Sequence, residues 1–263
     1  MLTLRIKTKM NTLIQPNSIK IDPSIISQID IESKSIYRAL TFCKKTSSKA
    51  LFDSFVNSTN SLTQLLSIKN AQMEAETEDE LKVYQKNLNK TIIYVANEIK
   101  NEIELTSQVQ LFQLFRLISP EAHELHPNQY RRTLVQIGGY ICPDPENLNS
   151  LVSQLFFNLE QIAHPLIKAI YLHHELIRIH PFIDGNGRTT RIAKNWILMF
   201  NLYPPIFIKD DFEKKEYISS LSKSFKTLGT NDSTWNEDTN VFFNLELKRV
   251  SHSIQYILNQ IKA

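Results

Sequence analysis

The chain has 263 residues, of which 42% are hydrophobic and 22% charged, a composition typical of a globular protein that buries a core. Its net charge of +3 allows an acidic partner, but lysines and arginines form no dense run, so a nucleic-acid-binding protein is not favoured. No run of about 18 apolar residues occurs, which excludes a membrane-spanning helix.

The compartment is suggested by the cysteines and by the first residues. Cys43 and Cys142 are too few for a disulfide framework, so we expect buried thiols in a reducing compartment. The first 16 residues include basic side chains but no continuous apolar stretch, unlike a cleaved signal peptide. We therefore expect a cytoplasmic protein, and the sequence leaves open its export into a host cell.

The first part of the chain is predicted to be an arm followed by helices. Residues 1–24 are expected to be extended or loosely held, and amphipathic helices follow up to residue 105. The acidic residues 73–80 we interpret as a solvated loop or a helix start. We expect residues 1–105 to form an N-terminal helical region, 106–228 a core, and 229–263 a C-terminal helical extension.

β-Strand character is confined to YRRTLVQIGGYI, residues 130–141, which follow a predicted helix at 108–118. Apolar and polar side chains alternate there, and Gly138 and Gly139 can adopt the positive φ of a tight turn. We predict a short β-hairpin at this place. In the next helix Pro145 lies early and Asp144 is a candidate cap. The expected fold is therefore mainly α with one small hairpin.

A helix, a loop and a second helix are predicted from residue 164 to about 202. HPLIKAIYLHHELIRI is a helical pattern, and Pro181 disfavours the α region for His180, so this helix ends at or before His180. The helical pattern returns after Gly187. Gly185 and Gly187 therefore lie at the start of a helix, where free N–H groups and the helix dipole bind anions and glycine permits close approach.

The polar residues of this loop suggest one chemistry. Arg188, Arg191 and Asn195 lie at i, i+3 and i+7, hence on one helix face, and two guanidinium groups suit a ligand with several phosphates. Asp184 can hold a hard cation such as Mg²⁺ on those phosphates. His180 can take a proton near neutral pH. Each residue alone has an ordinary structural explanation, because such a loop is commonly a turn, but together they favour a metal–nucleotide site.

The loop sequence HPFIDGNGRTTR resembles the signature of the Fic family, His-Pro-Phe-x-Asp/Glu-Gly-Asn-Gly-Arg-x-x-Arg, at every defining position. The similarity extends from about residue 109 to 224, where YRRTLVQIGGYICPDPENL resembles the hairpin called the flap and the helix after it. The resemblance implies a Fic-type helical bundle. It also implies a nucleotidyltransferase that moves AMP from ATP to a Ser, Thr or Tyr hydroxyl of a target protein.

The resemblance further implies a role for each matching residue. His180 would be the general base, Asp184 would bind Mg²⁺ (or Mn²⁺), and Phe182 would anchor the loop in the core. An intact Gly187 favours AMP transfer over phosphorylation. The nucleotide would be held by Gly185, Asn186, Gly187, Arg188, Arg191, Asn195 and Tyr217, and the target by the flap around Val135, Gln136 and Ile137.

Many Fic proteins carry a separate helix with the pattern Ser/Thr-x-x-x-Glu-Gly/Asn. Its glutamate pairs with the second signature arginine, blocks productive ATP binding and can support AMP removal. In LLSIKNAQMEAETEDE, residues 65–80, we align Lys69 with the glutamate and Leu65 with the Ser/Thr. We therefore predict a degenerate relic, with Lys69 near Arg191. The alternative is a working glutamate elsewhere, at Glu98 or Glu102.

Three functions stay open from the sequence. The first is an active AMP transferase. The second is a de-AMPylating or bifunctional enzyme, which requires a glutamate near Arg191. The third is a catalytically silent, nucleotide-binding interaction protein, against which the intact His180 and Asp184 argue. The expected partners are ATP and a target protein, with no membrane partner; self-modification and a homodimer are left open.

Overall fold

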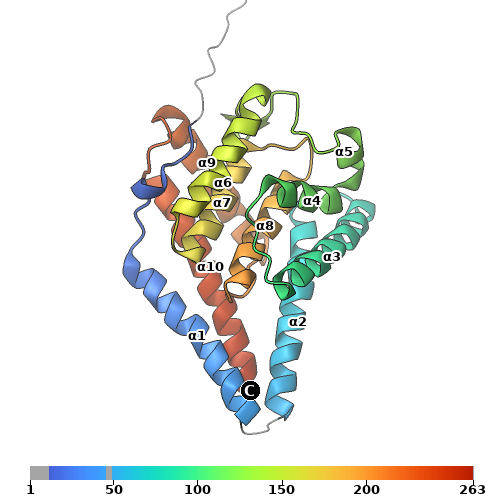
Figure 1. Ribbon diagram of the computed structural model, residues 1–263, viewed down its shortest axis with the longest axis vertical. Coiled ribbons are helices and arrows are strands. Elements are labelled where there is room, and N and C mark those ends of the chain that lie inside the picture. Colours follow the sequence, from blue (N-terminus) through green and yellow to red (C-terminus); the bar gives the residue numbers. More distant parts are fainter. Residues whose placement is uncertain (1–11, 46–48, 263) are drawn as a thin grey trace, which may run out of the picture.

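The computed structural model describes the backbone of residues 12–45 and 49–262, and their side chains except at 39–45, 49–60 and 260–262. These residues form a helical bundle with one small hairpin (Figure 1), which confirms the predicted mainly α fold. In chain order the elements are η1 (Pro16–Ser18), α1 (Pro23–Lys45), α2 (Lys49–Gln72), α3 (Glu78–Lys100), α4 (Gln108–Ile118), α5 (Pro120–Leu125), β1 (Gln136–Ile137), β2 (Tyr140–Ile141), η2 (Pro145–Asn147), α6 (Leu148–Gln161), α7 (Pro165–Ile179), α8 (Asn186–Phe200), α9 (Asp211–Thr230) and α10 (Glu237–Lys262).

Helices α7 and α8 lie in the middle of the bundle and pack against each other. Nearly every residue of α7 from Leu166 onward is buried, as is every residue of α8 from Arg188 to Leu198. A helix buried on all sides belongs to the centre of a protein, because no face needs solvent. The loop between α7 and α8 is therefore held by the two most enclosed helices described. Toward the lower end of Figure 1, α10 lies between α1 and α2.

The predicted hairpin is confirmed, in a shorter form than the alternating pattern suggested. Gln136 pairs with Ile141 and Ile137 with Tyr140 in antiparallel register. Gly138 and Gly139 have φ of +53° and +87°, as a two-residue turn between twisted strands requires. Asp144 precedes η2 but makes no side-chain cap hydrogen bond.

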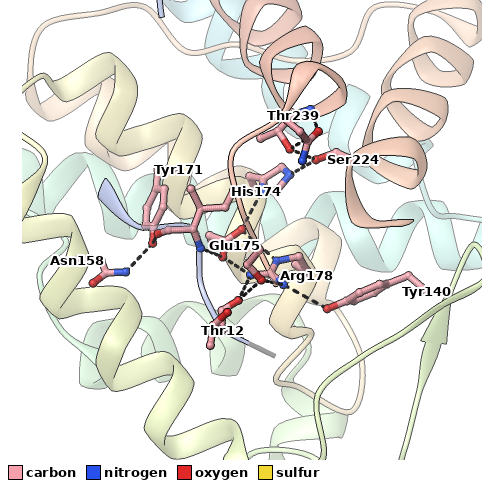
Figure 2. A network of polar contacts seen from close by, with 12 residues as sticks. Thr12, Tyr140, Asn158, Tyr171, His174, Glu175, Arg178, Ser224 and Thr239 are labelled. Atoms are coloured by element: carbon pink, nitrogen blue, oxygen red, sulfur yellow. Dashed lines mark hydrogen bonds and ion pairs between the residues drawn. The ribbon is translucent and has the colours of Figure 1, made fainter. Parts of the chain in front are cut away.

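The N-terminal arm is the clearest departure from expectation, although its residues 1–11 lie outside the described part. Leu13 and Ile14 are buried rather than loosely held. In the network of Figure 2, the Tyr171 hydroxyl donates to the Ile14 carbonyl at 2.7 Å, and the Ile14 N–H donates to Glu175 at 3.2 Å. Arg178 Nη2 donates to the Thr12 carbonyl at 2.6 Å. Polar groups of α7 thus hold the arm.

A buried ion pair lies at the centre of this network. Arg178 Nη2 is 2.6 Å from Glu175 Oε2, and both side chains are almost inaccessible to solvent. Burial alone would raise the pKa of Glu175, but the adjacent Arg178 and His174 lower that pKa to about 2. The pair is therefore charged at neutral pH, and each partner compensates the other.

Removal of one partner is expected to destabilise the protein strongly. Arg178→Ala leaves the Glu175 charge buried without compensation, so the free energy of unfolding should fall by about 3–5 kcal/mol in urea denaturation. Lys168→Ala is the matched control on the same helix. Lys168 is partly exposed, and its ion pair is weak, because its Nζ lies as far as 3.8 Å from Glu104 Oε1. That variant should lose at most about 1 kcal/mol. Equal losses in both variants would contradict the role assigned to the buried pair.

Two further expectations are settled only in part. Cys142 is buried, as expected, whereas the side chain of Cys43 lies outside the described residues. No helix in residues 12–45 and 49–262 combines the length and hydropathy that a membrane crossing requires. The division at residues 105 and 228 stays a prediction.

Candidate functional site

The loop between α7 and α8 is fixed by its own side chains. Helix α7 ends at Ile179, and His180 takes a left-handed conformation with φ of +51°. The amide of Asn186 accepts from the Phe182 N–H at 2.9 Å and donates to the Phe182 carbonyl at 2.8 Å. Phe182 is buried and stacks on Phe115, with 4.2 Å between ring centroids. The expected helix–loop–helix and the anchoring role of Phe182 are present.

A cavity of about 360 Å³ opens beside this loop. Loop, flap and α9 all contribute to its wall, so the fold joins segments that are far apart in the sequence. Of the residues expected at the site, those that line the cavity are Ile137, His180, Asp184, Gly185, Asn186, Gly187, Arg191 and Tyr217.

Other expected residues lie elsewhere. The side-chain amide of Asn195 is fully buried and bonds the backbone of Ile206 twice, accepting from its N–H at 2.8 Å and donating to its carbonyl at 2.9 Å. Asn195 does not line the cavity. Val135 and Gln136 lie on the flap outside the cavity wall, and Gln136 is exposed. Helical spacing placed Asn195 on the arginine face, but the segment that follows α8 covers it.

His180 is enclosed beside the cavity. Burial, together with the nearby positive charge of Arg131, lowers the pKa of His180 to about 4. Its Nδ1 atom is buried and has no hydrogen-bond partner among the described residues. The imidazole is therefore neutral at pH 7 and can accept a proton.

Asp184 is the exposed carboxylate of the loop. Its side chain is 58% exposed, and Oδ2 accepts from Arg188 Nη2 at 2.9 Å and from the Ser119 hydroxyl at 3.2 Å. A carboxylate oxygen suits Mg²⁺, which is usually held by one or two carboxylates together with substrate phosphates. Among the described residues no group of three or more His, Cys, Asp or Glu could hold a metal. The site therefore fits a cation that arrives with phosphates rather than a closed protein cage.

The carboxylate of Glu74 forms ion pairs with both arginines of the signature, Arg188 and Arg191. Its Oε2 is 2.8 Å from Arg188 Nε, and its Oε1 is 2.8 Å from Arg191 Nη2. Arg191 Nε also donates to the Asn70 side chain at 2.5 Å, and the Tyr84 ring centroid lies 3.7 Å from the Arg188 guanidinium carbon. The two positive charges expected to bind phosphates are thus already paired within the chain.

The close approach of Glu74 depends on the glycine at 187. A Cβ atom added there would lie 2.2 Å from Glu74 Oε1 and 2.9 Å from Arg191 Nη1, so the ends of these two side chains would have to move away. Gly187 therefore leaves room for a negatively charged oxygen above the start of α8. A phosphate oxygen could occupy the same space.

The assignment of Lys69 to this position is wrong. Lys69 lines a separate hollow with Gln72 and Asp210, and Glu74 follows the end of α2 in a turn. The prediction of a degenerate inhibitory motif is therefore wrong, because a glutamate, Glu74, does reach Arg191. The missed signal was the spacing from Asn70 to Glu74. With Asn70 in the Ser/Thr place of the family pattern, Glu74 falls on the glutamate.

The alternative glutamates do not reach the arginines either. Glu98 lies on α3, Glu102 lies two residues beyond its end, and neither lines the cavity. The expectation of a solvated loop or a helix start at residues 73–80 is correct for the second half, where Thr77 and Glu80 form a capping box at the start of α3. The side chain of Glu74, only 29% exposed, is the exception.

Comparisons with known proteins relate the chain to one family. A model of the Fic/DOC family matches residues 61–198, which are 138 of the 263 residues. Protein adenylyltransferase Fic of Culex quinquefasciatus is 34% identical over 128 residues, covering 47% of this chain and 26% of that protein. The protein of the same name from Nematostella vectensis is 32% identical over 141 residues, covering 51% and 33%. The match spans a third or less of these relatives.

Solved structures show the same fold. A Fic domain-containing signaling protein from Bacteroides thetaiotaomicron has a TM-score of 0.67 at 18% identity, covering 90% of this chain and 98% of that chain. Fic-1 from C. elegans has a TM-score of 0.63 at 18% identity, covering 90% and 73%. A variant of IbpAFic2 in complex with adenylylated Cdc42 has a TM-score of 0.50 at 15% identity, covering 77% and 70%. These low identities support the fold alone.

Proposed function

Because the chain belongs to the Fic/DOC family, we propose that it is a protein adenylyltransferase, which moves AMP from ATP to a hydroxyl group of a target protein. The observation that carries the proposal is the cavity lined by a neutral, partly buried His180, by Asp184 and by the glycine-containing start of α8. The names of the curated relatives support the same activity.

In this proposal each cavity residue has one task. The imidazole of His180 takes the proton of the target hydroxyl, whose oxygen forms a bond to the α-phosphorus of ATP. The bond from that phosphorus to the oxygen bridging the β-phosphate breaks, and pyrophosphate leaves. The start of α8 and Arg191 hold the phosphates, so that positioning and charge neutralisation supply most of the rate enhancement.

Asp184 would hold Mg²⁺ (or Mn²⁺) together with the phosphates, and the cation would neutralise part of their charge. Arg188 would bind the β-phosphate once Glu74 has moved away. Tyr217 lines the cavity, and its hydroxyl is 3.0 Å from His173 Nε2, so its ring is held firmly where the nucleoside would lie. Asn195 would support this region through the backbone that follows α8 rather than by contact.

The position of Glu74 supports two conclusions: that the enzyme is regulated, and that it has a second candidate function. While its carboxylate bridges Arg188 and Arg191, phosphates cannot bind both arginines, so we assign it the role of the family's inhibitory glutamate. A glutamate near Arg191 is also what removal of AMP from a modified protein requires. A bifunctional enzyme is therefore the second candidate.

The test is to incubate the protein and candidate target proteins with α-labelled ATP, and separately with γ-labelled ATP, in the presence of Mg²⁺. Label from the α position alone, bound covalently to a polypeptide, is the expected result. Label from the γ position would indicate phosphorylation and contradict the proposal. The Glu74→Gly variant is tested in parallel, because inactivity of the wild type alone would reflect inhibition.

The flap is proposed to bind the target as an added strand. Cys142 N–H donates to the Val135 carbonyl at 3.0 Å. Hydrogen-bonded and non-hydrogen-bonded pairs alternate in antiparallel strands, so the neighbouring pair, Gln136 with Ile141, is of the second kind. The N–H and carbonyl of Gln136 therefore point to the outer edge of the flap, where an extended target segment can pair with them.

Gln136→Pro is expected to remove one of these edge groups without breaking the hairpin. Loss of one hydrogen bond, worth about 0.5–1.5 kcal/mol, should lower kcat/KM for a protein target by about 2- to 10-fold. Gln136→Ala keeps the N–H and is the matched control, which should behave as wild type. ATP binding should be unchanged in both variants. Loss of ATP binding in Gln136→Pro would indicate misfolding instead.

A further inference from the structure

We propose that Arg131, which the sequence analysis did not single out, is a positioning residue that sets the flap at a fixed place relative to His180. This inference rests on the proposed function, because it assigns Arg131 the task of aligning a target hydroxyl with the general base. Arg131 lies five residues before β1, and its side chain is only 2% exposed.

The guanidinium group of Arg131 donates to four backbone carbonyls. Its Nε donates to His180 O at 2.7 Å and its Nη1 to Thr133 O at 2.6 Å. Its Nη2 donates to Pro143 O at 2.7 Å and to Ile179 O at 3.3 Å. Two of these acceptors belong to the flap and two to the end of α7.

The flap acceptors stand at both ends of the hairpin. Thr133 precedes β1 by three residues, and Pro143 follows β2 by two, so one planar group holds the two ends of the segment 134–142. The rigid fork of an arginine can satisfy several acceptors in one plane, which a lysine cannot do. The guanidinium group therefore fixes the position of the whole flap.

The other two acceptors fix the backbone at the general base. His180 has φ of +51°, a conformation that is sparsely populated outside glycine and persists only when its surroundings hold it. Arg131 bonds its carbonyl through Nε and the next carbonyl, that of Pro181, through its own backbone N–H at 2.8 Å. Arg131 thus holds the left-handed turn that directs the imidazole.

Flap and base are consequently positioned by the same side chain. A target strand bound to the flap places its hydroxyl at a distance from His180 that Arg131 determines. Reacting groups must lie about 3–3.5 Å apart for efficient transfer, and a displacement of about 1 Å can cost about 100-fold in rate. The burial of a charged guanidinium group among four backbone carbonyls is consistent with this demand for geometry.

The first test is Arg131→Lys in the Glu74→Gly protein, with kcat, KM and ATP affinity measured separately. We expect kcat for a protein target to fall by about 100-fold, because the lysine keeps the charge but not the fork. ATP affinity should stay within about twofold of the parent, since the hydrogen bonds of the Arg131 guanidinium group go to residues 133, 143, 179 and 180, outside α8. Arg132→Lys is the matched control: Arg132 is exposed, bonds only Gln129 in the described structure, and should leave all three values unchanged.

Two readouts separate positioning from a general loss of stability. In Arg131→Ala, millimolar guanidinium should restore part of the transfer rate, whereas His180→Ala should not respond. Hydrogen exchange in Arg131→Lys should become faster both at residues 134–142 and at 180–182, while α9 and α10 keep their protection. Proportional loss of kcat, ATP affinity and protection throughout the chain would overturn the proposal, as would an unchanged kcat.

The outcomes also separate this inference from the proposed function. If neither the Glu74→Gly parent nor Arg132→Lys labels any target from α-labelled ATP, the proposed function has failed. Hydrogen exchange still decides the structural claim in that case. Faster exchange confined to the flap and to 180–182 would support Arg131 as the link between them, and unchanged exchange in either segment would refute it.

Discussion

His180→Ala is expected to lower the rate of AMP transfer by about 10²–10⁴-fold, the usual contribution of a general base, while ATP binding is retained. His180 lines the cavity, and its lowered pKa leaves it neutral at pH 7, ready to accept the hydroxyl proton. The rate is measured with α-labelled ATP in the Glu74→Gly background. His252→Ala is the matched control, because that histidine is exposed on α10.

The same assignment predicts the pH dependence. The imidazole loses its function as a base when it gains a proton, so kcat/KM should fall as the pH drops through the pKa of His180 in the free enzyme. Because that pKa is lowered to about 4, kcat/KM should stay level from pH 7 down to about pH 5. A fall centred near pH 6.5 would show that the pKa of His180 is not lowered, and wild-type rates in His180→Ala would show that His180 is not the general base.

Glu74→Gly is expected to raise the rate of AMP transfer by about 10- to 100-fold. Two charge-assisted hydrogen bonds, from Arg188 and Arg191, hold the Glu74 carboxylate where phosphates would bind. A hydrogen bond to a charged group is worth about 1.5–3 kcal/mol, and ATP must displace the carboxylate before both arginines can bind it. Tyr84, stacked on Arg188, remains in place to hold that side chain for the phosphate.

The matched control is Glu76→Gly, which removes an exposed carboxylate two residues away in the same segment. It should leave the rate unchanged, and Lys69→Glu should also have little effect, since Lys69 lies in a different hollow. A lower rate in Glu74→Gly would contradict inhibition by Glu74. If the wild type instead removes AMP from a labelled target and the variant does not, the bifunctional enzyme is the better description.

The sequence alone determined the elements whose causes are local. Pro181 ends α7 before His180 because a proline restricts the residue that precedes it. Gly138 and Gly139 form the hairpin turn because glycine adopts positive φ readily. The spacing within residues 180–191 placed His180, Asp184 and Gly187 around one cavity because neighbours in a short loop cannot move far apart.

Only the tertiary structure decided which distant groups meet these residues. Glu74 and Arg188 are separated by 114 positions, and their ion pair depends on how the end of α2 packs against α8. The family pattern aligned on Leu65 and Lys69 lies five residues too early. Glu74 lies beyond the end of α2, in a turn whose direction helix periodicity does not predict. The alignment therefore put a positive charge where the structure has a negative one.

The same reason applies to Asn195, Arg131 and the N-terminal arm. Helix spacing correctly put Asn195 in line with the arginines, but it could not show that the backbone of Ile206 covers it. Arg131 contacts carbonyls up to 50 positions away, and Ile14 lies against Tyr171 and Glu175, more than 150 positions along the chain. Backbone carbonyl groups are the same in every residue. Contacts with them therefore depend on where the packed backbone lies and not on residue type.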